Sequence, residues 1–217
     1  MMSKILTPLQ NSFLQEFFNY TREFYLTGGT ALSAFYLQHR LSEDLDFFTN
    51  SDAAFRYADN IVNDVSAVLK IPASSITITS YFKHFNVGGR DDLLTLHFSK
   101  DVSYHVKPSA HFGNVIVDSL EDIAANKICA VLGRTEMKDL IDLFFLDKAG
   151  YEVDRYFSFA EQKDGGLTYE TLAYALSQFT IVEIPRFVIK VVALQELQNY
   201  LESLVEYCVR RSRPPTV

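Results

Sequence analysis

The feature that most constrains this chain is the stretch LTGGTALSAFYLQHRLSEDLDFF, which covers residues 26–48. Two adjacent glycines, Gly28 and Gly29, follow a short apolar segment and precede a run with helical spacing. The run leads into SEDLDFF, where Asp44 and Asp46 flank a leucine at the start of a second strand pattern. Residues two apart on a strand point to the same face, so we expect the two carboxylates to project together.

Paired carboxylates in so apolar a segment need a physical reason. Two ionised carboxylates this close repel each other, and burying them unpaired is costly. A divalent cation removes both penalties, and Mg²⁺ commonly binds one or two carboxylates together with nucleotide phosphates. The pattern therefore predicts a Mg²⁺ or Mn²⁺ site at Asp44 and Asp46. The alternative is a pair of surface carboxylates on an edge strand, or caps for neighbouring turns.

The glycines suggest an anion site beside that metal. Gly28, Gly29 and Thr30 join a strand end to a helix start. Glycine lets the backbone approach a ligand closely, and the free N–H groups of a helix N-terminus attract phosphate. Thr30 would either N-cap the helix or offer its hydroxyl to a phosphate oxygen. Arg40 and Ser42 lie just before the carboxylates, and we expect them to contact the nucleotide.

Periodicity along the chain predicts an α+β fold, with a small mixed sheet first and helices after it. We expect a core over residues 1–117 and a helical part over residues 118–217, packed on the core as one unit. Helices are predicted over residues 8–20, 31–40, 53–69, 118–132, 135–148 and 194–211. Strands are predicted over residues 24–27, 45–48, 76–82 and 93–99, with short strands at 104–107 and 115–117.

Composition indicates a cytoplasmic protein that does not enter a membrane. No apolar run approaches the ~20 residues needed to cross a bilayer. The first residues, MMSKILTPLQ, lack the apolar core of a signal peptide. Cys129 and Cys208 each lie in a helical pattern, which fits buried thiols in a reducing compartment.

The net charge of −7 bears on possible RNA partners. An acidic chain repels nucleic acid at long range, so an RNA contact needs a local basic patch. The clearest basic cluster is Arg210, Arg211 and Arg213, although a solvated helix end explains it better, since cations favour helix C-termini.

A family resemblance rests on these motifs. Gly29-Thr30, thirteen residues, and then Asp44-Leu45-Asp46 resemble the signature of the polymerase-beta-like nucleotidyltransferase superfamily. The fuller strings LTGGTAL and HRLSEDLDFF resemble the nucleotidyltransferase family of AbiEii/AbiGii abortive-infection toxins, the toxin half of type IV toxin–antitoxin systems. The resemblance continues in SLEDIAANKICAVLGRTEMKDLIDLFFL. It implies the polymerase-beta-like fold and a metal-dependent transfer of nucleotide.

Three charged residues in the later segment take roles from this resemblance. Lys127 lies on an apolar helical face, where a lysine either snorkels to water or reaches into a site. The resemblance implies that Lys127 contacts nucleotide phosphates. It also implies that one aspartate of the next helix faces the active site, and we expect Asp142 in that role with Asp139 as support. The alternative is an ion-pair ladder with Lys138 and Arg134.

The sequence departs from the superfamily pattern at one position. Many members carry a third carboxylate on a strand after the hairpin, and that strand here is LLTLHFS, without an acid. Asp92 and Asp101 only flank it. Either His97 occupies the vacant position, or the site works with two aspartates and Asp142. A histidine on the sheet surface is an equally good explanation of His97.

These observations support three functions. The first is transfer of a nucleoside monophosphate from a nucleoside triphosphate to an acceptor hydroxyl. The family resemblance implies that this hydroxyl belongs to tRNA, another RNA 3′ end or a protein, and that an antitoxin is a possible further partner. The second is a degenerate relative that binds a nucleotide and regulates a partner without turnover. The third is a small-molecule nucleotidyltransferase, acting on an aminoglycoside-like alcohol whose positive charge suits the acidic chain.

Overall fold

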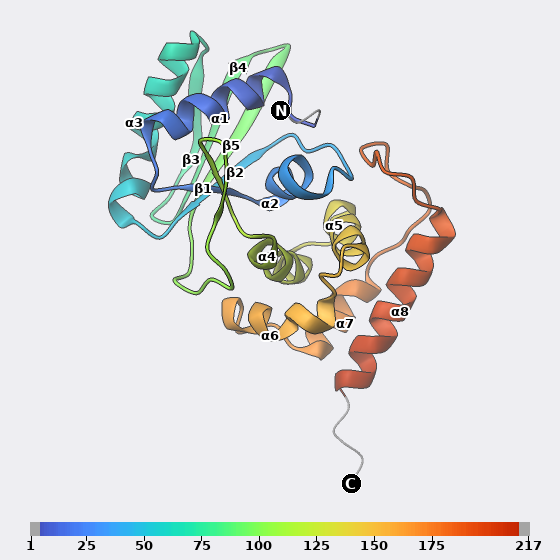
Figure 1. The fold of residues 1–217 in the computed structure, drawn as a ribbon. Helices are drawn as coiled ribbons and strands as arrows, with labels where there is room; N and C mark the ends of the chain where they lie inside the picture. Colours follow the sequence, from blue (N-terminus) through green and yellow to red (C-terminus); the bar gives the residue numbers. More distant parts are fainter. Residues whose placement is uncertain (1–4, 213–217) are drawn as a thin grey trace. The chain divides into compact units, whose positions relative to one another are not determined.

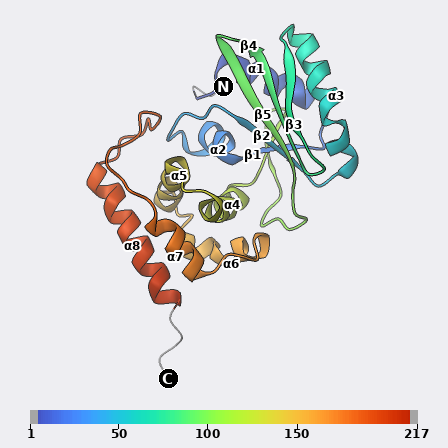
Figure 2. The ribbon, with the colours of Figure 1, turned by 180° about the vertical axis from the view of Figure 1, so that it is seen from behind.

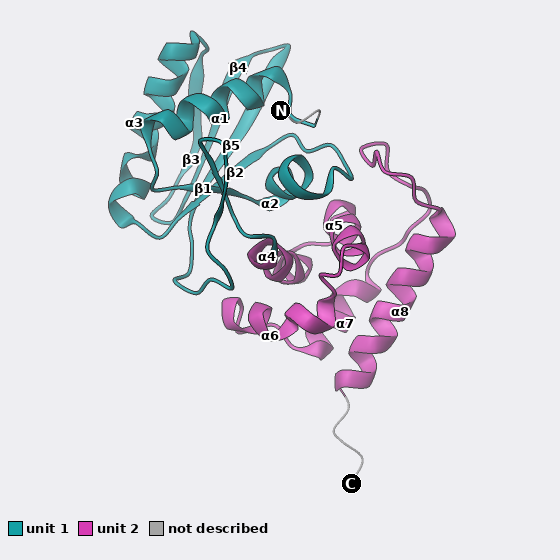
Figure 3. Ribbon diagram, in the orientation of Figure 1, with its two compact units in different colours: residues 1–120 teal, residues 121–217 magenta. Residues whose placement is uncertain are grey.

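The structure, a computed structural model, describes residues 5–212 (Figure 1). The first four residues of the N-terminal stretch and Arg213 of the basic cluster lie outside this range. The chain divides into two compact units, residues 1–120 and 121–217, coloured teal and magenta in Figure 3. The first unit holds a sheet and helices, and the second is helical, which confirms the predicted α+β class.

A mixed sheet of seven strands forms the centre of the first unit, in the order β3-β4-β5-β2-β1-β7-β6. The strands β2 and β5 are parallel, as are β1 and β7, and the other neighbours are antiparallel. The strands are β1 (Tyr25–Thr27), β2 (Leu45–Thr49), β3 (Ala73–Ile78), β4 (Phe82–Gly89), β5 (Asp92–Lys100), β6 (Ala110–Phe112) and β7 (Val115–Val117).

Two helices, α1 (Pro8–Tyr20) and α3 (Asp52–Leu69), lie side by side on one face of this sheet (Figures 1 and 2). The helix predicted over residues 8–20 is confirmed at both ends. A capping box of Thr7 and Gln10 stabilises its N-terminus. Phe17 of α1 is fully buried at the centre of an aromatic cluster. Its ring centroid lies 4.3–6.1 Å from those of Phe13, Phe18, Phe24, Phe47 and Phe98.

Alternation along the central strands separates this core from a polar face. In β2, Leu45 and Phe47 are buried while Asp46 between them is half-buried. In β5, Leu96 and Phe98 are buried while His97 is half-buried. Side chains on a strand alternate between faces, so Asp46 and His97 project from the face that does not pack on α1 and α3. The two-residue period of the sequence therefore predicted these orientations correctly.

The strand predicted over residues 76–82 is wrong. Residues 76–82 are not one strand, because β3 ends at Ile78 and β4 begins at Phe82. Between them Thr79 and Phe82 close a tight turn, in which the Thr79 N–H donates to the Phe82 carbonyl over 2.8 Å. The partner of β5 is therefore β4, and their turn lies at residues 90–91.

Two further boundaries differ from the sequence prediction. Residues 104–107 form no strand, and β6 forms at residues 110–112 instead. The helix predicted over residues 31–40 begins earlier, as α2 (Gly28–Ala31), and continues as a π-helical segment (Leu32–Leu37). It ends there because Gln38 adopts a left-handed conformation, with φ of 51°.

The second unit consists of helices joined by loops. They are α4 (Leu120–Gly133), α5 (Met137–Lys148), α6 (Val153–Lys163), α7 (Tyr169–Ser177) and α8 (Leu194–Ser212). The predicted last helix over residues 194–211 is confirmed to within one residue. Within residues 5–212, none of the helices combines the length and apolar character that a membrane crossing requires.

The aromatic cluster yields a test of the fold. We expect Phe17→Ala to lower the free energy of unfolding by about 3–5 kcal/mol, because it leaves a cavity among five packed rings. Tyr20→Ala, on the same helix but 47% exposed, should change it by less than about 0.5 kcal/mol. Urea unfolding of both variants measures the difference. Equal effects would show that Phe17 is not central to the core.

Candidate active site

The motif residues of the first unit meet where β1 ends and α2 begins. Thr27, the last residue of β1, pairs with Asp46 of the antiparallel strand β2. Gly28 follows with φ of 69°, a conformation that favours glycine. A Cβ on Gly28 would lie 2.2 Å from Oδ2 of Asp46. The first glycine is therefore needed because the Asp46 carboxylate occupies the place of its missing side chain.

The second glycine makes room for an arginine. A Cβ on Gly29 would lie 2.3 Å from Nη2 of Arg40 and 3.1 Å from Oγ of Ser42. Arg40 is only 3% exposed, and its Nη1 donates to the Leu41 carbonyl over 2.9 Å. A buried guanidinium beside the first amide groups of a helix concentrates positive charge and N–H donors. This arrangement suits an anion such as phosphate.

Hydrogen bonds fix the segment that leads into Asp44. Thr30 lies inside α2 rather than at its N-cap, and its hydroxyl donates to the Asp44 carbonyl. Nε2 of Gln10 donates to the carbonyls of Ser42 and Glu43, over 2.9 and 3.0 Å. Gln10 also forms the capping box with Thr7 at the start of α1, and local sequence carries no signal for its second, long-range role.

The two carboxylates of the motif differ in position. Asp46 lies within β2, and Asp44 lies one residue before that strand begins. In the parallel register of β2 and β5, Asp46 stands opposite His97, and its Oδ1 lies 3.0 Å from Nδ1 of His97. The Asp46 and His97 side chains are 29% and 26% exposed, so a solute can reach both.

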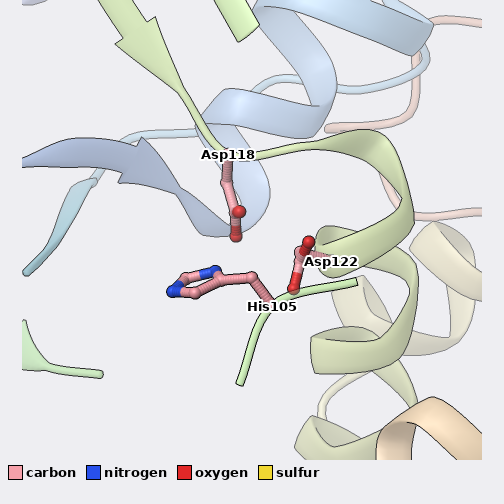
Figure 4. A group of neighbouring side chains, drawn as sticks. All are labelled: His105, Asp118 and Asp122. Carbon is pink, nitrogen blue, oxygen red and sulfur yellow. The ribbon is translucent and has the colours of Figure 1, made fainter. Parts of the chain in front are cut away.

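A second polar pair, His105 and Asp118, lies in the first unit beside β1 (Figure 4). The Thr27 hydroxyl donates to Oδ2 of Asp118 over 2.8 Å, and a ring nitrogen of His105 lies within 4.8 Å of an Asp118 oxygen. Sequence reasoning placed Asp118 only at the start of a helix and gave His105 no role. Figure 4 also labels Asp122, which belongs to the second unit.

Three predicted site residues come together in the second unit. Lys127 is 5% exposed, and its ammonium lies 2.9 Å from Oδ1 of Asp139 and 2.6 Å from Oδ2 of Asp142. Lys127 therefore does not snorkel to water. Nε of Arg134 also lies 2.8 Å from Oδ2 of Asp139, as the ion-pair alternative predicted. Lys138 pairs with Glu136 instead, at 2.8 Å.

The charges around Asp139 change its acidity. Burial alone would raise the pKa of the Asp139 carboxyl, but the Lys127 ammonium and the Arg134 guanidinium outweigh burial. The pKa of Asp139 is therefore held below its ordinary value of 3.8. Asp139 stays ionised at neutral pH, and its negative charge is matched by neighbouring cations.

Comparisons with known proteins agree with this fold. A crystal structure of a candidate nucleotidyltransferase from H. pylori is similar, with a TM-score of 0.62, 19% identity, and 93% of this chain and 92% of that chain covered. The crystal structure of JHP933 from Helicobacter pylori gives a TM-score of 0.59 and 20% identity, with 93% of this chain and 89% of that chain covered. No curated protein matches the chain.

The fold is thus that of a nucleotidyltransferase. Residues 12–187 match the family described as nucleotidyl transferase AbiEii toxin, type IV TA system. This match spans most of the chain, so the protein belongs to the AbiEii family. The resemblance seen in LTGGTAL and HRLSEDLDFF is confirmed at the level of the family.

Two glycines with similar positive φ angles separate the effect of Asp46 from that of the φ angle itself. We expect Gly113→Ala, at φ of 66° with open space around it, to cost about 1–2 kcal/mol of stability. Gly28→Ala, at φ of 69°, should cost about 1–3 kcal/mol more, because its new methyl group displaces the Asp46 carboxylate. Urea unfolding measures both. Equal losses would contradict the close contact at Gly28.

The pKa of Asp139 predicts a pH dependence. A lowered folded-state pKa adds stability above the ordinary value of 3.8, and this stability is lost as pH falls through the folded pKa. Asp139→Asn should therefore lower the free energy of unfolding by about 3 kcal/mol at pH 7. The difference in the free energy of unfolding between Asp139→Asn and wild type should become smaller below pH 3.8. Glu202→Gln, which removes the same charge from an exposed position, is the control. A difference in unfolding free energy between Asp139→Asn and wild type that does not change with pH would contradict this account.

Proposed function

We propose that this protein transfers a nucleoside monophosphate from a nucleoside triphosphate to an acceptor hydroxyl. The acceptor oxygen bonds to the α-phosphorus, the α–β phosphoanhydride bond breaks, pyrophosphate leaves, and the hydroxyl proton passes to solvent or a base. The observation that carries the proposal is the contact of Gly28 with Asp46, because it sets a helix N-terminus directly beside a carboxylate. Membership of the AbiEii family supports the same reaction.

The phosphates would bind at the two glycines. The backbone N–H groups at the start of α2 attract anions, and the glycines let a phosphate approach the backbone. The Arg40 guanidinium beside Gly29 adds positive charge, and the Ser42 hydroxyl lies next to it. Thr30 acts indirectly in this proposal, because its hydroxyl holds the Asp44 carbonyl. These groups would orient the triphosphate and so lower the entropic cost of reaction.

Asp44 and Asp46 would hold the metal ion. Carboxylate oxygens are the donors that Mg²⁺ and Mn²⁺ prefer, and the Asp46 side chain is partly exposed on the polar face of the sheet. A cation bound there would supply positive charge to the phosphoryl oxygens as the leaving group departs. The protein's own contribution is to fix Asp46 through strand pairing and Asp44 through Thr30.

The second unit contributes Lys127 and Asp142 to the proposal. The resemblance assigns the Lys127 ammonium to the nucleotide phosphates, where it would stabilise developing negative charge. Asp142 pairs with Lys127 and would orient it, and Asp139 supports the same ammonium. Because two carboxylates hold this ammonium, its position is defined before any substrate arrives.

The acceptor would be a hydroxyl of tRNA, of another RNA 3′ end, or of a protein side chain. The AbiEii family is described as the toxin of a type IV toxin–antitoxin system. We therefore include an antitoxin as the partner that limits this activity in the cell. The labelling experiment that follows separates an RNA acceptor from a protein acceptor.

Loss of one carboxylate tests the metal site. With purified protein, Mg²⁺ or Mn²⁺, each α-³²P-labelled nucleoside triphosphate and bulk tRNA, we expect wild type to label an acceptor. Asp46→Asn should lower the rate at least about 100-fold, because it removes a charge that holds the cation. Asp91→Asn, an exposed change of equal charge in the β4–β5 turn, should keep the wild-type rate.

The outcomes of this assay decide between functions. A labelled RNA band identifies the acceptor as RNA and identifies the preferred base, whereas label on the protein indicates a side-chain acceptor. Equal labelling by wild type and Asp46→Asn would exclude the metal site. If no triphosphate gives label, nucleotide binding without turnover becomes the better explanation, and nucleotide affinity should then still depend on Arg40.

A further inference from the structure

We propose that His97 donates a ring nitrogen to the same cation as Asp46, and that the site consequently prefers a divalent transition metal to Mg²⁺. This inference rests on the proposed function, because it requires a metal ion at Asp46. It goes further by assigning a ligand outside the aspartate motif and by naming the class of cation.

The spacing of the two side chains fits a shared ion. Nδ1 of His97 lies 3.0 Å from Oδ1 of Asp46. In an octahedral complex with bonds of about 2.1 Å, adjacent ligand atoms lie about 3.0 Å apart, which is the bond length multiplied by √2. The two atoms are hydrogen-bonded to each other in the structure, and an ion that replaced the shared proton would find them at the separation of neighbouring ligands.

The sheet holds both ligands in place. Asp46 and His97 stand opposite each other in the register of β2 and β5, and both project from the polar face. The ring of His84 packs against the His97 ring at 4.9 Å between centroids, and the ring of Phe82 packs at 5.6 Å. Strand pairing fixes the backbones, and these rings restrict rotation of the imidazole. The ligand pair is thus organised in the protein before an ion binds.

Solvent can reach this pair. The side chain of His97 is 26% exposed and that of Asp46 is 29% exposed. A hydrated cation can therefore exchange water for Nδ1 and Oδ1 without local unfolding. The remaining coordination positions would be left to water and to nucleotide phosphates.

An imidazole ligand changes which cation binds best. Mg²⁺ takes oxygen ligands almost exclusively, whereas first-row transition metals also bind imidazole. A site with one nitrogen and one or two carboxylate oxygens therefore favours a transition-metal dication. Mn²⁺ is a suitable probe, because it accepts the oxygen ligands of Asp44 and Asp46 and is paramagnetic.

Pulsed electron paramagnetic resonance of Mn²⁺ bound to the full chain tests the assignment without nucleotide or turnover. We expect wild type to show hyperfine coupling to an imidazole nitrogen. His97→Gln should abolish this coupling and weaken Mn²⁺ binding roughly tenfold or more, since even indirect partners of metal ligands contribute about 10–100-fold. His111→Gln, which removes an exposed histidine of β6, should leave both unchanged.

A second variant converts the ligand instead of removing it. His97→Asp replaces the nitrogen by carboxylate oxygen, so we expect Mn²⁺ binding to persist without nitrogen coupling. The ratio of Mn²⁺ affinity to Mg²⁺ affinity, measured by competition, should fall by about tenfold or more. An unchanged ratio would overturn the selectivity that we assign to His97.

Failure of this inference can be told apart from failure of the proposed function. If wild type binds Mn²⁺ without nitrogen coupling, and Asp46→Asn abolishes binding, the metal site stands and His97 is not a ligand. If nitrogen coupling survives in His97→Gln, another histidine is the ligand and the inference is overturned. If Mn²⁺ does not bind, or binds equally to Asp46→Asn, both the inference and the metal site of the proposed function fall.

Discussion

The pairing of β1 with β2 is the constraint on which the candidate site of the first unit depends. It places Thr27 beside Asp46, so the chain that turns into α2 must pass directly over a carboxylate. A side chain there would have to displace the Asp46 carboxylate, and the left-handed backbone of Gly28 completes the turn. The helix N-terminus, the arginine beside Gly29 and the aspartate of β2 are brought together by this single register. A shift of one residue would turn Asp46 into the aromatic core.

The two faces of the sheet differ in what they carry: one packs against the aromatic core, and the other carries the polar residues of the candidate site. Aromatic rings of α1, β2 and β5 pack on one face and exclude water, as the contacts of Phe17 show. Asp46 and His97 use the other face of β2 and β5. The polar side chains therefore do not disturb the core, and their positions are as rigid as the strands that carry them. This is the arrangement that a metal site needs, because ligand geometry must be defined to a fraction of an ångström.

The sequence predicted the fold class, the helix α1, the central strands and the local grouping of Gly28, Gly29 and Asp46. These succeed because each depends on short-range signals: apolar residues at helical spacing, a two-residue period and a strand–Gly–Gly–helix turn. It failed at residues 76–82, where a turn at Thr79 divides the predicted strand, and at residues 104–107, which form no strand. The contacts of Gln10, Asp118 and His105 could not be predicted, because they join residues that only the tertiary fold brings near each other. His97 lies between these cases, since its face was predictable but its partner was not.

The charged residues of the two units differ in how their charges are balanced. Asp44 and Asp46 are two carboxylates placed two residues apart, and an added cation would stabilise such a pair. Lys127, in contrast, pairs with both Asp139 and Asp142. Arg134 also pairs with Asp139, so two cations face two carboxylates. Breaking a buried arrangement of this kind is expensive, so the Lys127 ammonium is held rather than mobile.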